Sequence, residues 1–109
     1  MHHPRTVLNV ARNGTDHFSF SGEIDLATIS QFRASLAELT SGPGPTYVAD
    51  LSGVTFIGSS ALSALAETHD QVRESGSLVI VASQAALRLI ELTGLDSVLN
   101  VTLENGSPA

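Results

Sequence analysis

The chain has 109 residues, which is enough to bury one hydrophobic core and too few for a second, so we expect a single domain over residues 1–109. Its formal net charge is −6, and its cations are five scattered arginines. Such a chain repels phosphate backbones and anionic lipid, which argues against nucleic acid or a membrane surface as partners and favours a protein. It has no cysteine, which excludes disulfides, thiol catalysis and cysteine-bound metal.

No segment of the sequence is typical of export or membrane insertion. Residues 1–5 lack an apolar stretch of signal-peptide length, and no run of about 18 apolar residues occurs. We therefore expect a cytoplasmic protein without a membrane span.

The chain opens with two segments that alternate between apolar and polar side chains, residues 6–12 and residues 17–24. The pair Asn13-Gly14 between them is a favoured turn sequence. This arrangement predicts a β-hairpin.

A helical pattern follows the hairpin and ends at the Gly-Pro-Gly-Pro run of residues 42–45. Asp25 stands just before the helix, where an aspartate most often serves as an N-cap worth about 1 kcal/mol. The apolar residues that recur at three- and four-residue steps, and so share one helix face, are Ile29, Phe32, Leu36 and Leu39.

The next elements are a strand and a helix joined by a glycine-containing loop. Residues 47–51 predict a short strand, and residues 53–60 are expected to leave it as a loop. From Leu62 the apolar residues repeat at helical spacing until Gly76, so the second helix follows Gly58.

The chain ends with a strand, a helix and a further strand. Residues 78–82 form a continuous β-branched run, typical of a strand covered on both faces at the centre of a sheet. Ser83 is expected to cap the third helix, which closes at Gly94, and residues 98–103 predict the last strand.

This element order predicts an α/β domain with a mixed, mostly parallel sheet of about five strands, an initial antiparallel hairpin and three to four helices. We expect its ordered core to cover about residues 6–103. In such sheets, functional loops gather beyond the carboxyl ends of the strands. Residues 22–25 leave the second strand and residues 53–60 the third, so we expect Asp25 and Ser59 on one surface.

Ser59 and Ser60 stand where an apolar run changes to a helical pattern. The first N–H groups of a helix lack internal partners, and the helix dipole places partial positive charge there. A serine at this junction can cap the helix or carry a phosphoryl group, which makes Ser59 a candidate switch.

The motifs of enzymes are incomplete in this chain. Gly53 and Gly58 have the glycine spacing of a P-loop, but Ser59 stands where the phosphate-binding lysine belongs. The serine-hydrolase pattern G-x-S-x-G is absent. His69 falls on the apolar face of the second helix and His17 on an edge-like, exposed strand, so neither is a convincing base. Because metal-ligand spacing is also missing, we predict no catalytic residue, metal or cofactor.

Two segments resemble the signatures of STAS-domain anti-sigma factor antagonists. They are residues 22–26 (GEIDL) and residues 50–62 (DLSGVTFIGSSAL), and the element order is similar over about residues 6–103. The resemblance implies a bacterial regulator of transcription in stress responses. The unphosphorylated form of such a protein binds an anti-sigma factor, which is also a serine kinase, and thereby releases a sigma factor.

Phosphorylation of the motif serine abolishes this binding in the family, and a separate serine phosphatase restores it. The serine that matches the phosphorylation site is Ser59. The other partner-binding residues that the resemblance implies are Asp25, Gly58, Ser60 and Leu62.

Two residues depart from the family pattern Asp-Ser-Ser/Thr-Gly-Leu. Ala61 replaces the glycine and raises helix propensity by up to about 1 kcal/mol. Gly58 replaces the aspartate and removes a charge and a possible cap. This loss either weakens recognition by the kinase or eases a phosphoserine into place by removing like-charge repulsion. Two other functions stay open: a STAS scaffold that is never phosphorylated, and a nucleotide or small-ligand sensor with an anion site at the helix start.

Overall fold

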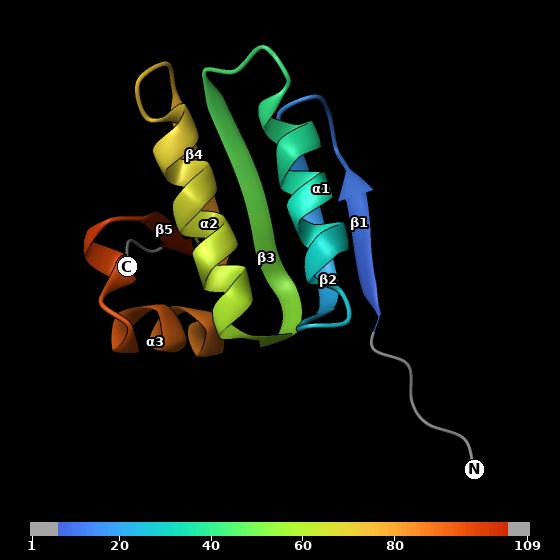
Figure 1. Cartoon of the computed structure of the whole chain (residues 1–109), viewed down its shortest axis with the longest axis vertical. Helices are drawn as coiled ribbons and strands as arrows, with labels where there is room; N and C mark the ends of the chain where they lie inside the picture. The colour runs from blue at the N-terminus through green and yellow to red at the C-terminus, as the bar shows by residue number, and fades with distance from the viewer. Residues whose placement is uncertain (1–6, 105–109) are drawn as a thin grey trace.

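Five strands form one mixed sheet with three helices packed against it in the computed structural model, which describes residues 7–104 (Figure 1). The sheet order is β1-β2-β3-β4-β5, in which only β1 and β2 pair antiparallel. This confirms the predicted α/β domain with an opening hairpin. The strands are β1 (Leu8–Arg12), β2 (His17–Ile24), β3 (Thr46–Ile57), β4 (Ser77–Ala82) and β5 (Asn100–Leu103). The helices are α1 (Ile29–Thr40), α2 (Ser59–Val72), α3 (Gln84–Leu92) and the short 3-10 turn η1 (Leu95–Ser97).

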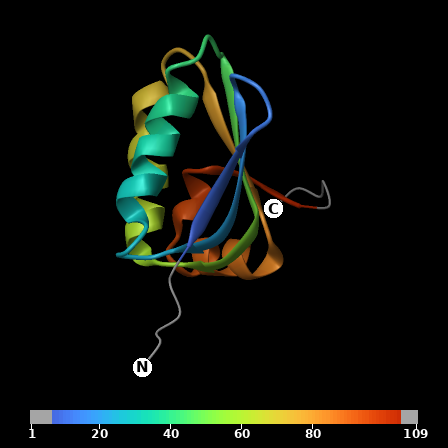
Figure 2. The same cartoon turned by 90° about the vertical axis from the view of Figure 1, so that its right-hand side faces the viewer.

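The side view in Figure 2 shows α1 and α2 together on one face of the sheet. The core between these layers is largely aliphatic, with Phe20 and Phe32 fully buried in it. Their rings meet edge to face with centroids 5.1 Å apart, a favoured aromatic geometry. No helix among residues 7–104 has the length and apolar character needed to cross a membrane.

The prediction that residues 78–82 form the central strand, covered on both faces, is wrong. β3 is central, and β4 lies between it and the edge strand β5. Leu78 and Ile80 are buried, whereas Val79 and Val81 alternate with them and are only half-buried. Successive side chains of a strand point to opposite faces, so the valines lie on the face away from Leu78 and Ile80. Because residues 78–82 are all apolar, the sequence does not show that one face of this strand is more buried than the other.

β3 is much longer than the predicted strand at residues 47–51. It continues to Ile57 because β2 pairs beside it as far as Glu23 with Phe56 and Ile24 with Ile57, after two register shifts that each leave an extra residue in β3. β4 pairs with β3 only as far as Asp50. The expected loop at residues 53–57 is therefore strand, and only β2 pairs with this end of β3.

The helix boundaries are close to those expected. Ser83 caps α3, since its hydroxyl oxygen accepts the Ala86 N–H at 3.2 Å. Gly94 follows α3 with a φ of 79°, a left-handed conformation that favours glycine. The last strand begins at Asn100 rather than at residue 98. The predicted first strand residue, Thr6, and the tail from residue 105 lie outside the described residues.

Candidate functional site

The carboxyl ends of β2 and β3 bring two distant segments of the chain together. Ile24 and Ile57 are paired at the ends of these parallel strands, and the Gly58 N–H donates to the Ile24 carbonyl at 2.9 Å. The turn before α1 and the start of α2 therefore leave the sheet side by side. They line a hollow of about 640 Å³ formed by Asp25, Leu26, Ala27, Phe56, Gly58, Ser59 and Ser60.

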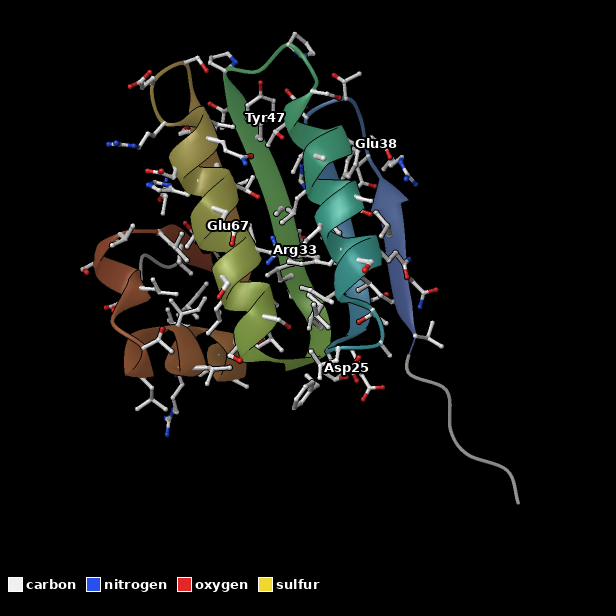
Figure 3. The ribbon with its side chains drawn as sticks, in the orientation of Figure 1. Asp25, Arg33, Glu38, Tyr47 and Glu67 are labelled. Atoms are coloured by element: carbon white, nitrogen blue, oxygen red, sulfur yellow. The ribbon has the colours of Figure 1, made fainter. Side chains whose placement is uncertain are left out.

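Asp25 stabilises the turn that precedes α1. Its Oδ1 accepts the Ala27 N–H at 2.8 Å, and its own N–H donates to Thr28 Oγ1 at 3.0 Å. Thr28 is buried, occupies the N-cap position of α1, and donates its hydroxyl to the Glu23 carbonyl at 2.8 Å. The predicted N-cap role of Asp25 is wrong, because the turn separates Asp25 from the first helical residue. In Figure 3, Asp25 lies at the end of the molecule opposite Tyr47.

Ser59 is exposed and is the first residue of α2. Gly58 occupies the N-cap position and offers no side-chain hydrogen bond. The Ala61 N–H donates to the Gly58 carbonyl at 3.1 Å, but no acceptor within residues 7–104 serves the N–H groups of Ser59 and Ser60. These free donors and the helix dipole favour negative charge at the Ser59 hydroxyl.

The other residues predicted for this site differ in exposure. Ser60 and Gly58 are half-buried and line the hollow. Leu62 is 3 % exposed and belongs to the core, so its side chain is not part of the surface. Leu62 lies in the first turn of α2, on the buried face that it shares with Ala61 and Leu65.

Two exposed apolar residues of the hollow were missed by sequence reasoning. Leu26 is 86 % exposed and Phe56 is 51 % exposed. Phe56 stands inside an apolar run that suggests burial, but it is half-exposed near the end of β3, where β2 pairs with the strand and β4 does not. Leu26 follows Asp25 directly, so its place in a turn after a strand was the one available signal.

The hollow is poor in charge. Among residues 7–104, Asp25 is the one charged residue of its lining. The ion pairs among the described residues lie elsewhere: Arg12 pairs with Glu38, Arg33 with Glu67, and Arg73 with Asp70. Figure 3 shows Arg33 and Glu67 meeting between α1 and α2, away from Asp25. No arginine among residues 7–104 lines the hollow, so the described lining offers no cation to neutralise a negative charge added here.

The histidines offer no catalytic group at the hollow. His69 is half-buried on α2, as expected, and its Nδ1 is buried without a hydrogen-bond partner among the described residues. His17 is half-buried on β2, an interior strand, so the prediction of an exposed histidine on an edge-like strand is wrong. Residues 7–104 contain no group of three or more His, Asp and Glu side chains arranged to hold a metal ion.

The sequence matches the STAS domain family over residues 8–106. The chain belongs to the STAS domain family. Anti-sigma-F factor antagonist RsfB of Mycobacterium tuberculosis is 36 % identical to it over 92 residues, covering 84 % of this chain and 75 % of RsfB. The crystal structure of an anti-sigma factor antagonist from Mycobacterium paratuberculosis is 32 % identical, with a TM-score of 0.76 and coverage of 87 % of this chain and 83 % of that one.

More distant structures share the fold of this STAS domain. The anti-sigma factor antagonist SpoIIAA in its unphosphorylated form is 14 % identical, with a TM-score of 0.65 over 91 % of this chain and 90 % of that one. SpoIIAA of Bacillus in its phosphorylated form is also 14 % identical, with a TM-score of 0.60 over 91 % of this chain and 94 % of that one. At this identity the likeness concerns the fold alone.

Gly58 is not required by the backbone of this STAS domain. Its φ is −90° and its ψ is 172°, an extended conformation open to any residue. A Cβ there would lie 3.5 Å from the Ile24 carbonyl oxygen and 3.7 Å from Phe56 Cε2, which is ordinary van der Waals contact. The backbone and the space around the Cβ position therefore do not require a glycine here.

Proposed function

We propose that this STAS domain is an anti-sigma factor antagonist that binds an anti-sigma factor through the hollow at the ends of β2 and β3. The observation that carries the proposal is that one hollow joins the Asp25 turn to the free start of α2 and exposes Leu26 and Phe56 beside Ser59. Apolar side chains around a weakly charged centre are typical of the core of a protein interface. Two relatives above 30 % identity are anti-sigma factor antagonists, which supports the same role here.

Ser59 is the switch in this proposal. The bound anti-sigma factor is a serine kinase that phosphorylates it, and a serine phosphatase reverses the change. A phosphoryl group adds about −1.5 to −2 charge, which the helix start tolerates but a docked partner must desolvate beside the Asp25 carboxylate. We expect the fold to persist while binding is lost. SpoIIAA shares the fold and exists in phosphorylated and unphosphorylated forms, which is consistent with this expectation.

The test combines phosphorylation with binding. The purified chain is incubated with an anti-sigma factor kinase from the same organism and MgATP, and the product is mapped by mass spectrometry. Modification is expected at Ser59. In calorimetry without ATP, Ser59→Ala should retain the wild-type Kd, whereas Ser59→Asp should raise it about tenfold or more.

Ser63 provides the matched control. It is exposed on α2, one turn beyond Ser59, and does not line the hollow. Ser63→Asp adds the same charge to the same helix and should change the Kd by less than about threefold. Equal affinities of Ser59→Asp and Ser59→Ala would contradict the switch, and binding without any modification of Ser59 would favour an unphosphorylated scaffold.

A further inference from the structure

Phe56 separates the hollow beside Ser59 from a second hollow. The second one measures about 200 Å³ and lies between the end of β3 and the first turns of α3. Its α3 lining includes Ala85, Ala86 and Leu89, and among residues 7–104 Phe56 is the one residue that lines both hollows. The two hollows are therefore adjacent across this half-exposed side chain.

The lining of each hollow combines apolar side chains with one exposed hydroxyl residue, Ser59 in the first and Thr55 in the second. Leu26 and Phe56 are exposed in the first hollow, and Ala85 is exposed and Leu89 half-buried in the second. β4 pairs with β3 only as far as Asp50, so among residues 7–104 no strand pairs with β3 beside Phe56 on that side. The result is a band of apolar surface, the Phe56 band, formed by Leu26, Phe56, Ala85 and Leu89.

The size of protein interfaces argues that a partner covers more than the first hollow. A stable complex buries about 800 Å² on each partner and involves about 20 to 30 residues a side, whereas seven residues line the first hollow. Along α1 and α2 the surface away from Asp25 carries the ion pair of Arg33 and Glu67 (Figure 3). Toward α3 the lining is mostly apolar, with Thr55 as its one polar residue among residues 7–104. Burying apolar surface favours association at about 25 cal/mol per Å².

We infer that the anti-sigma factor of the proposed function docks across both hollows, with Phe56 as the central anchor and the first turns of α3 as a second contact. The inference rests on the proposed function and extends its interface. The partner would place apolar side chains on both sides of the Phe56 ring. An exposed aromatic ring between two hollows has the position of a binding hot spot, which is surrounded by contacts that exclude water.

Two variants test the inference by calorimetry with a purified anti-sigma factor from the same organism. Phe56→Ala removes the anchor and is expected to raise the Kd about tenfold or more. Ala85→Arg fills the second hollow from an exposed helix position without removing any core contact, and it should weaken binding to a similar extent. Thermal unfolding of each variant checks that the domain remains folded.

Leu92 is the matched control for Ala85. It is 79 % exposed, lies on the same helix and lines neither hollow. Leu92→Arg should change the Kd by less than about threefold. If Ala85→Arg binds like the wild type while Ser59→Asp does not bind, the inference is overturned and the proposed function stands. If the wild type binds no anti-sigma factor, the proposed function fails together with its extension.

A second copy of the chain is the competing occupant of the Phe56 band. Sedimentation velocity of the isolated protein distinguishes it. A monomeric wild type with the losses of affinity described above supports the inference. A wild-type dimer that Ala85→Arg dissociates, with the affinity for the anti-sigma factor unchanged, would assign the band to self-association and overturn it.

Discussion

The starts of α2 and α3 occupy the same end of the sheet, and each follows a parallel strand with a serine at the junction (Figure 1). Ser83 stands one position before its helix and accepts the Ala86 N–H, so α3 is capped by its own sequence. Ser59 is already inside α2, Gly58 supplies no cap, and the free N–H groups remain available to a negative charge. Ser83 and Ser59 thus differ by one position relative to the helix start. The N-cap serine is structural, and the serine at the first helical position is the candidate switch.

The largest expected effect concerns packing beneath the first of these junctions. Leu62→Ala should lower the free energy of unfolding by about 2–5 kcal/mol, because Leu62 is buried in the core. The affinity of the folded fraction for the anti-sigma factor should stay near the wild-type value. Denaturant unfolding and calorimetry measure the two quantities, and a stable variant with lost affinity would return Leu62 to the interface.

The next effect tests the capped junction. Ser83→Ala should lower the free energy of unfolding by about 1 kcal/mol, because the hydrogen bond from the Ala86 N–H to the Ser83 hydroxyl is lost. Ser59→Ala lacks such a bond to lose and should leave the midpoint of urea unfolding nearly unchanged. Equal destabilisation by both variants would show that the two serines have the same structural role.

A smaller effect is expected when the start of α2 is given a capping side chain like that of α3. Gly58→Asp supplies a capping side chain on α2. It should raise the free energy of unfolding by only a few tenths of a kcal/mol, since glycine is itself a tolerable N-cap. Its added carboxylate lies beside Ser59 and should slow phosphorylation if charge repulsion dominates, or speed it if the kinase recognises the acid. Rates of phosphate incorporation into Gly58→Asp and into Gly58→Asn, its uncharged counterpart, separate the two outcomes.

The smallest effect lies away from both junctions. A hydrogen bond from Arg12 holds the pKa of Glu38 below its usual value. The pair therefore contributes stability above the unfolded-state pKa of about 4.3, and this contribution is lost as the pH falls through the lower pKa of the folded state. Glu38→Gln should flatten the pH dependence of unfolding in this acidic range. An unchanged profile would show that the exposed pair has no effect on stability.

Much of the fold was predictable because local signals agreed with one another. The Asn13-Gly14 turn, the Gly-Pro-Gly-Pro run after α1 and the Ser83 cap each act within a few residues of the chain, and each appears near its predicted position. The errors concern β3 and β4. How far β3 extends depends on pairing with β2, and which face of β4 is covered depends on where the helices pack, so neither can be read from the strand itself.

In the candidate site, too, some features follow from local sequence and others from contacts between distant segments. The sequence by itself determined that Asp25 and Ser59 follow parallel strands, that Gly58 brings no side chain to this junction, and that no cation stands near Ser59 in the chain, since these depend on residue order and local backbone preference. Only the tertiary structure decided that Leu62 is buried, that Asp25 closes a turn through Thr28, and that Phe56 is exposed between two hollows. These features arise from pairing and packing between segments far apart in the chain, which no local pattern encodes.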